Sequence, residues 1–418
     1  MTLIKTSLLN GIAVLIKMLT LLGINKLLAI YVGPAGYAAV GQFQNAVQMI
    51  TTFASGAIGT GVTKYTAEYE LDAEKQYQVW RTAGTIAIIG SLVVGAIVSF
   101  YNQELASFFL KDQTYGSVFN WFSVALVFFS LNAVLVAILN GQREVVLYVI
   151  ANIAGSIFAL LATAILSIQF GLYGALVALA TYQSVSFVVT LGLCYKRPWF
   201  ALRRVLGRVD RTVLLNLAKY TLMALTSAAC VPASHIFIRN YLVENLSVTD
   251  AGYWEAMWRL SAAYLLLITT TLSVYFLPKL SGSQDPKFLK LEIRKGLRLI
   301  VPFSIISGVG IFLLRDLIIL LLFTKEFSPM RVMFFWQLLG DCFKVAGWML
   351  AYIMLSRPLV KLYVATEVVF SLGFCALSVV FVKLYGLEGA AVAHAVNYLV
   401  YLLVMYYFIF NKYLKVQE

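Results

Sequence analysis

Long apolar segments recur along the whole of this chain, and they constrain its fold more than any other feature. Each is about 18 residues or longer, which is enough for a helix to cross a hydrocarbon core of about 30 Å. The apolar residues are continuous and do not alternate with polar ones, which excludes the strands of a membrane β-barrel. The sequence therefore predicts an all-α integral membrane protein.

We expect twelve transmembrane helices. The expected spans are residues 8–32, 38–63, 82–101, 117–139, 145–169, 173–195, 213–240, 251–277, 297–322, 330–356, 359–382 and 387–410. With the N-terminus inside, 22 of the 32 Lys and Arg residues fall in cytoplasmic segments and six, Arg239 among them, in outer segments. Cytoplasmic loops collect Lys and Arg, so this bias predicts that both termini are cytoplasmic. Orientation and contact with anionic membrane lipids account for the net charge of +13, and no nucleic-acid partner is expected.

The two halves of the chain resemble each other and are joined by a basic stretch. The sequence GLYGALVA begins at Gly171 and GLEGAAVA at Gly386, so six of eight positions agree at an offset of 215. Residues 196–219 between the halves carry seven cations and one acid. We therefore expect an N-terminal six-helix lobe at 1–195, a basic cytoplasmic linker at 196–212 and a C-terminal lobe at 213–418. Six is even, so the lobes would run parallel and could transport by rocking about a central site.

Motifs for covalent chemistry are missing from the sequence. It contains no GxxxxGK[ST] phosphate loop, no HExxH and no GxSxG. The four cysteines lie far apart in apolar segments, which suggests neither a disulfide framework nor a metal site. We expect a protein that is not an enzyme and needs no cofactor. His235 and His394 fit packed intramembrane histidines better than proton carriers.

Ionisable residues inside the expected spans are the candidates for function, because such residues are costly in lipid and usually face a bundle interior or a water-filled cavity. Glu255 and Arg259 are four residues apart and Asp341 and Lys344 are three apart, so each pair can meet on one helix face. Each pair either fixes helix packing or takes part in transport. Glu367 is a further acid inside a span.

Lys17 lies near the middle of the first span and has no acid three or four residues away. At about 100° per residue, its side of the helix also carries the polar residues of that span: Ser7, Asn10, Thr20 and Asn25. Lys26 lies on the opposite side, near the membrane surface, where it can extend toward water. We expect Lys17 to face a cavity.

The second span carries four amides that make it too polar to face lipid on all sides: Gln42, Gln44, Asn45 and Gln48. They could hydrogen-bond to sugar hydroxyls or to neighbouring helices.

Several short motifs together resemble a known family. They are YVGPAG at 31–36, GVTKYTAEY at 61–69, IRN at 238–240 and QLLGDCFKV at 337–345. The chain resembles the bacterial lipid-linked oligosaccharide flippases of the enterobacterial common antigen (lipid III) and O-antigen types, within the superfamily of multidrug and oligosaccharidyl-lipid exporters. The resemblance implies the two-lobed extruder fold in the cell inner membrane. It also implies transport of an undecaprenyl-pyrophosphate-linked oligosaccharide from the cytoplasmic to the periplasmic leaflet.

Candidate roles follow from that implied substrate. Compensating positive charge for the pyrophosphate would come from Lys17, Arg259 and Lys344, and sugar contacts from Gln44, Asn45 and Gln48. Glu255, Asp341 and Glu367 are candidate proton or ion carriers. A polymerase and a chain-length regulator at the periplasmic face are candidate partners.

Three other functions stay open. A drug or cation antiporter of the related extruder family usually has an acid in its first lobe, but the first six expected spans contain no Asp or Glu. A sugar permease of the major facilitator class usually carries GxxxDRxGRR after its second span, where this chain reads GVTKYTAEYELDAEKQ. A scaffold protein for polysaccharide enzymes would show no transport in a flux assay.

Overall fold

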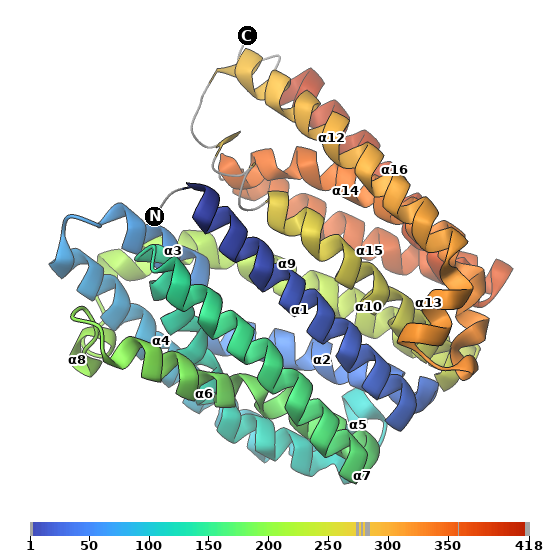
Figure 1. Cartoon of the computed structure of the whole chain (residues 1–418), viewed down its shortest axis with the longest axis horizontal. Helices are drawn as coiled ribbons and strands as arrows, with labels where there is room; N and C mark the ends of the chain where they lie inside the picture. The colour runs from blue at the N-terminus through green and yellow to red at the C-terminus, as the bar shows by residue number, and fades with distance from the viewer. Residues whose placement is uncertain (1–2, 273–275, 277–278, 281–284, 358, 414–418) are drawn as a thin grey trace. The chain divides into compact units, whose positions relative to one another are not determined.

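The chain is described by a computed structural model that covers residues 3–272, 276, 279–280, 285–357 and 359–413, with the backbone alone for residues 3–10, 216, 219–220 and 412–413. These residues form helices and their connections, without strands (Figure 1). Nine of the helices in the described ranges are long and apolar enough to cross a membrane. The expected all-α, multi-pass membrane fold is confirmed, whereas the number twelve and the cytoplasmic termini remain predictions.

The chain divides into two compact units. Unit 1 comprises the chain up to Val32 and residues 39–232, and unit 2 comprises residues 33–38 and the chain from Ala233 onward. The helices of unit 1 are α1 (Leu3–Tyr31), α2 (Gly33–Ser55), α3 (Gly59–Glu68), α4 (Ala73–Phe100), α5 (Asn102–Leu110), η1 (Gln113–Tyr115), α6 (Gly116–Gly141), α7 (Val145–Tyr195), α8 (Leu202–Val205) and the first part of α9 (Arg211–Asn245). Those of unit 2 are the rest of α9, α10 (Val248–Thr271), α12 (Pro286–Leu313), α13 (Arg315–Leu322), η3 (Lys325–Met333), α14 (Phe334–Ser356), α15 (Val360–Tyr385), α16 (Leu387–Tyr406) and the π-helical η4 (Tyr407–Tyr413). The boundary between the units falls at Pro232 inside α9, and six-helix lobes at 1–195 and 213–418 stay a prediction.

Glycines at the repeated sequence positions have the same conformation in both units. Helix α7 is interrupted at Gly171, with φ 56° and ψ −130°. Gly386 separates α15 from α16 with φ 59° and ψ −137°, values that glycine adopts most easily. Three positions later, Gly174 and Gly389 each lie so close to a backbone carbonyl that a Cβ atom would collide with it. The sequence repeat at offset 215 therefore corresponds to a repeated turn between two helices.

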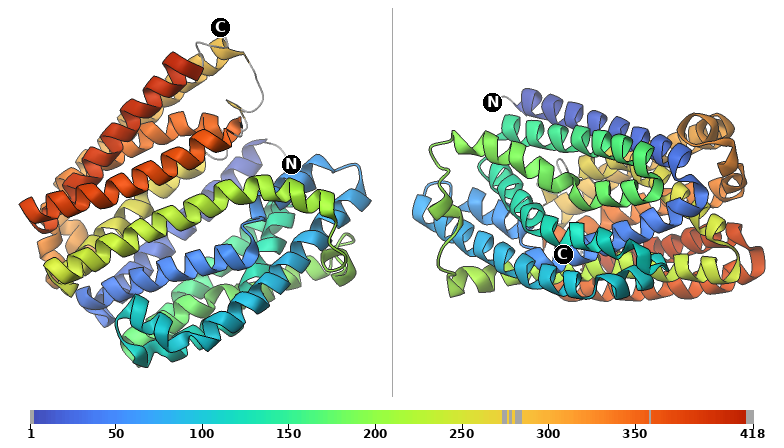
Figure 2. Two further views of the ribbon diagram at one scale, coloured as in Figure 1. Left: turned by 180° about the vertical axis from the view of Figure 1, so that it is seen from behind. Right: turned by 90° about the horizontal axis from the view of Figure 1, so that it is seen from below.

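The two helices on either side of each turn pack against each other. In α7, a Cβ atom at Gly155 would lie 3.1 Å from the hydroxyl of Ser186, so the two halves of α7 run antiparallel. Between α15 and α16, the rings of Phe370 and Tyr401 have centroids 4.9 Å apart. Helix α1 lies beside α7, as the views in Figures 1 and 2 both show. At 51 residues α7 is far too long for one span, at about 1.5 Å per residue.

The expected continuous span at 38–63 is wrong. Helix α2 ends at Ser55 because Gly56 takes a left-handed conformation with φ 64°, and Ala57 follows with φ 51°. The N–H of Gly56 donates to the carbonyl of Phe53 at 3.2 Å, as in a common helix C-terminal cap. A second helix, α3, then starts at Gly59.

The basic linker is folded onto α4. The guanidinium of Arg81 donates to the carbonyl of Arg203 at 3.1 Å, and the N–H of Asp210 donates to the hydroxyl of Thr82 at 3.0 Å. Gly84 leaves room for the carbonyl of Val205, where a Cβ atom would collide. Helix α9 starts at Arg211, two residues earlier than expected. The basic linker is therefore shorter than expected, and it packs on the rest of unit 1.

Candidate functional site

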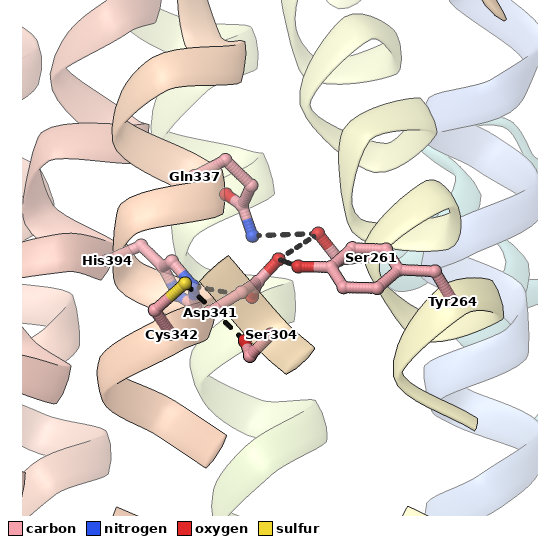
Figure 3. A network of polar contacts seen from close by, with 7 residues as sticks. All are labelled: Ser261, Tyr264, Ser304, Gln337, Asp341, Cys342 and His394. Atoms are coloured by element: carbon pink, nitrogen blue, oxygen red, sulfur yellow. Dashed lines mark hydrogen bonds and ion pairs between the residues drawn. The ribbon is translucent and has the colours of Figure 1, made fainter. Parts of the chain in front are cut away.

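A fully buried carboxylate, Asp341 of α14, is the centre of a polar network inside unit 2 (Figure 3). Its Oδ2 accepts hydrogen bonds from the hydroxyl of Ser261 at 2.6 Å and from that of Tyr264 at 2.7 Å. Its Oδ1 lies 3.0 Å from Nε2 of His394. Three helices, α10, α14 and α16, therefore meet at one carboxylate.

The network continues beyond these contacts and has hydrogen-bonding capacity left over. The side-chain amide of Gln337 donates to the hydroxyl of Ser261 at 3.3 Å. Nδ1 of His394 and Oε1 of Gln337 are buried and have no hydrogen-bond partner within the described part of the chain. Buried polar atoms in native proteins nearly always find a partner, so these two atoms are places for water, a proton or a ligand group.

Helical spacing and one glycine build this network. Gln337, Asp341 and Lys344 lie at positions i, i+4 and i+7 of α14 and so share one face. Gly340 lies where a Cβ atom would collide with the imidazole of His394. The missing side chain at Gly340 lets α16 bring His394 close enough to reach Asp341.

The structure does not pair Asp341 with Lys344, contrary to the spacing-based expectation. The ammonium of Lys344 lies among three aromatic rings, 4.5 Å from the centroid of Trp258, 4.9 Å from that of Trp348 and 5.1 Å from that of Tyr398. Such contacts stabilise a cation through the negative faces of the rings. Lys344 is nevertheless buried with only 7% of its surface exposed, and no described carboxylate lies within 4.0 Å of its nitrogen.

Glu255 bridges two arginines. Its Oε1 accepts from Nε of Arg259 at 3.0 Å, as the four-residue spacing predicts, and its Oε2 pairs with Arg239 of α9. Arg239, counted among the cations of the outer segments, lies inside helix α9 with its side chain only 2% exposed within unit 2. One carboxylate therefore holds two guanidinium groups.

Lys17 of α1 is exposed, although it lies on the packed side of its helix. At about 100° per residue it falls within roughly 20° of Ile24 and Leu28, which are both buried. Of its expected polar neighbours, Thr20 and Asn25 are buried, and the side chains of Ser7 and Asn10 lie outside the described residues. This arrangement fits the expectation that Lys17 faces a cavity, which stays a prediction.

The candidate sugar-binding amides of α2 do not all line the same pocket. Gln44 and Gln48 line a pocket of about 290 Å³ in unit 1, whereas Asn45 is not among the lining residues. Glu367 of α15 is half-buried.

Sequence reasoning missed Arg239, Ser261, Tyr264 and Gln337 as members of the unit 2 site, and it took His394 for a packed histidine. Ser261 and Tyr264 share a face of α10 at i and i+3, a signal that the sequence offers once α14 is known to be near. Arg239 and His394 meet their partners 16 and 53 positions away, and no local spacing indicates either contact.

Comparison with known structures identifies the fold. A multidrug resistance MATE family transporter of the MOP superfamily, in an inward-facing conformation, superposes with a TM-score of 0.78 at 15% identity, covering 96% of this chain and 94% of that chain. The lipid II flippase MurJ, inward closed, gives a TM-score of 0.72 at 14% identity, covering 97% and 87%. The chain therefore has the fold shared by these transporters.

Two protein relatives are similar along almost their whole length. The chain is 27% identical over 401 residues to the lipid III flippase of Escherichia coli (strain K12), covering 96% of both proteins. The lipid III flippase of Shigella flexneri matches to the same extent. Residues 32–332, well over half of the chain, match the model of the family described as polysaccharide biosynthesis protein. The chain therefore belongs to this polysaccharide biosynthesis protein family.

Proposed function

We propose that this protein is a flippase that moves an undecaprenyl-pyrophosphate-linked oligosaccharide from the cytoplasmic to the periplasmic leaflet of the bacterial inner membrane. The observation that carries the proposal is the similarity to lipid III flippases over 96% of both chains. Membership of a polysaccharide biosynthesis family and the fold shared with a lipid II flippase support the same activity. The protein is a transporter, and its substrate leaves chemically unchanged.

The substrate sets two physical demands. Its pyrophosphate and sugars cannot cross hydrocarbon unaided, whereas its polyprenyl tail can stay in the bilayer. We assign the pyrophosphate or acidic sugars to Lys17, Arg259 and Lys344. Lys17 and Lys344 lie within helices that are long and apolar enough to cross a membrane, and Arg259 lies within a span expected from the sequence. Alternating access between two six-helix lobes, with both termini cytoplasmic, would carry the headgroup across. A polymerase and a chain-length regulator at the periplasmic face are the partners this substrate implies.

The energy source in this proposal is an ion gradient, removal of the product, or both. Asp341 is the best placed of the three candidate carriers, because its carboxylate contacts His394 and two hydroxyl groups. Glu255 already holds two arginines, which makes it a better organiser of the site than a proton carrier. Glu367 remains a third candidate.

Complementation of a lipid III flippase-null strain tests the proposed function. Expression of this protein should stop lipid-linked glycan from accumulating at the cytoplasmic face, and purified protein in liposomes should move fluorescent lipid-linked glycan between leaflets. A chain that inserts normally in the membrane and does neither would contradict the proposal.

A drug antiporter is the second candidate, and the superposition on a MATE transporter at a TM-score of 0.78 favours it. The cations of unit 2, Arg239, Arg259 and Lys344, would repel the cationic drugs that such transporters commonly export. Expression in a drug-sensitive strain decides between the two: a flippase leaves the inhibitory concentration of cationic dyes unchanged, and an antiporter raises it.

A further inference from the structure

A pocket in unit 1 contains two of the amides that the sequence offers as candidate sugar contacts, Gln44 and Gln48. It lies between α2, α6 and α7 and has a volume of about 290 Å³. Nine residues line it, among them Gln44, Gln48, Thr51, Phe129, Tyr182 and Gln183. None of these nine residues carries an ammonium, guanidinium or carboxylate group. The lining is thus polar and aromatic, but uncharged.

The lining residues of α2 lie on one face of that helix, and those of α7 lie on one face of theirs. Gln44, Gln48 and Thr51 lie at i, i+4 and i+7 of α2, on one face. On α7, Leu179, Tyr182 and Gln183 do the same at i, i+3 and i+4. Tyr182 also accepts a hydrogen bond from the amide of Gln183 at 3.0 Å, which fixes the direction of its hydroxyl.

Thr51 indicates that the pocket takes a hydrogen-bonding ligand. Its side chain is 9% exposed, and its hydroxyl is buried without a hydrogen-bond partner in the described chain. The neighbouring Thr52 differs, because its hydroxyl donates to the carbonyl of Gln48 at 2.7 Å. A buried hydroxyl left unpaired destabilises the protein, and a ligand hydroxyl or amide in the pocket would remove that cost.

The chemistry of the lining selects one class of ligand. Carboxamides and hydroxyls both donate and accept, which matches the hydroxyl and acetamido groups of a sugar. The rings of Phe129 and Tyr182, with centroids 6.3 Å apart, add apolar surface for the C–H face of a pyranose. A pyrophosphate or a uronic acid would find no counter-charge here, and an apolar drug would leave the hydroxyl of Thr51 unpaired.

We propose that this pocket binds one uncharged sugar residue of the lipid-linked glycan, and so reads the glycan separately from the pyrophosphate. The inference rests on the proposed flippase function. The volume lies just below the range of about 300–1,000 Å³ typical of small-ligand pockets, which suits a single sugar better than a whole oligosaccharide. Glycan specificity then resides in unit 1, on the face of α2 that carries Gln44 and Gln48.

Binding to the full chain in lipid nanodiscs tests this assignment with three probes: undecaprenyl pyrophosphate, the same carrier bearing one N-acetylglucosamine, and free N-acetylglucosamine. Wild type should bind the glycosylated carrier more tightly than the bare one. Replacing Gln44 and Gln48 together by alanine removes two neutral hydrogen bonds to the sugar. It should lower that preference about tenfold and leave the affinity for the bare carrier unchanged. Gln169→Ala, an exposed amide of α7 outside the pocket, is the matched control.

Thr51→Val separates recognition from stability. It should lower the preference about two- to tenfold without lowering the melting temperature, because the hydroxyl has no partner within the protein to lose. Free sugar should compete only weakly, since it lacks the effective concentration that the membrane carrier provides.

The possible outcomes distinguish a failure of the proposed sugar site from a failure of the proposed flippase function. An unchanged preference in both pocket variants, or equal wild-type affinity for the two carriers, overturns the sugar site and leaves the flippase intact. Competition by free sugar that is equally strong in wild type and in both pocket variants also overturns it. A wild-type protein that binds neither carrier contradicts the proposed function itself.

Discussion

Asp341 and His394 are 53 positions apart in the sequence, and Oδ1 of the first lies 3.0 Å from Nε2 of the second, with both side chains fully buried. Lys344 is only three positions from Asp341 but packs among aromatic rings instead. The partner of this carboxylate is therefore on another helix, α16, and the contact links the two helices within unit 2.

A double-mutant cycle should detect that link. Asp341→Asn and His394→Gln should each destabilise the protein, and their effects should couple by about 0.5–3 kcal/mol, as for residues in direct contact. The cycle of Asp341→Asn with Lys344→Gln should give a smaller coupling, because those side chains form no ion pair. Melting curves in detergent measure both cycles, and equal coupling in the two would contradict the observed geometry.

The contact between Asp341 and His394 depends on the absence of a side chain at Gly340. Gly340→Ala should destabilise unit 2 by about 1–3 kcal/mol, because the new Cβ atom collides with His394 and the backbone of Ala395. Gly310→Ala is the matched control, since nothing lies within 4 Å of its Cβ position. Alanine there should be neutral or stabilising by up to about 1 kcal/mol, as expected inside a helix. Two variants with the same melting temperature would show that α14 and α16 are not tightly packed at Gly340.

Local patterns in the sequence predicted much of the fold and part of the site. Continuous apolar segments indicated membrane helices, and the expected breaks between spans at 169–173 and 382–387 coincide with the turns at Gly171 and Gly386. The four-residue spacing of Glu255 and Arg259 correctly indicated an ion pair. These features depend on neighbours a few residues away, which a single sequence displays directly.

Contacts between distant helices were beyond the reach of spacing arguments. The ion pair of Arg239 with Glu255 and the contact of His394 with Asp341 depend on how helices pack, so the sequence did not indicate either of them. The break of α2 at Gly56 was missed because an isolated glycine is also tolerated within a helix.

The orientation in the membrane predicts which residues a reagent can reach. Arg208, exposed in the basic linker, should face the cytoplasm, and Lys111, exposed after α5, the periplasm. In intact spheroplasts, the Lys111→Cys variant should react with a membrane-impermeant thiol reagent and the Arg208→Cys variant should not. After permeabilisation both should react. Reaction of the Arg208→Cys variant before permeabilisation would reverse the topology inferred from the cation bias.

Lys17 is the residue for which transport and stability should separate most clearly. It is exposed on the side of α1 that further along packs through Ile24 and Leu28, so its ammonium makes little contribution to packing. Lys17→Ala should abolish transport of lipid-linked glycan while protein abundance stays near normal, because only the positive charge offered to the substrate is lost. Lys17→Arg should keep part of the activity, since the charge remains with a different shape. Lys26→Ala, a lysine change on the opposite side of the same helix, should be milder. Complementation and liposome flux measure all three variants against immunoblots of the membrane fraction. Normal flux in Lys17→Ala would remove this residue from the mechanism.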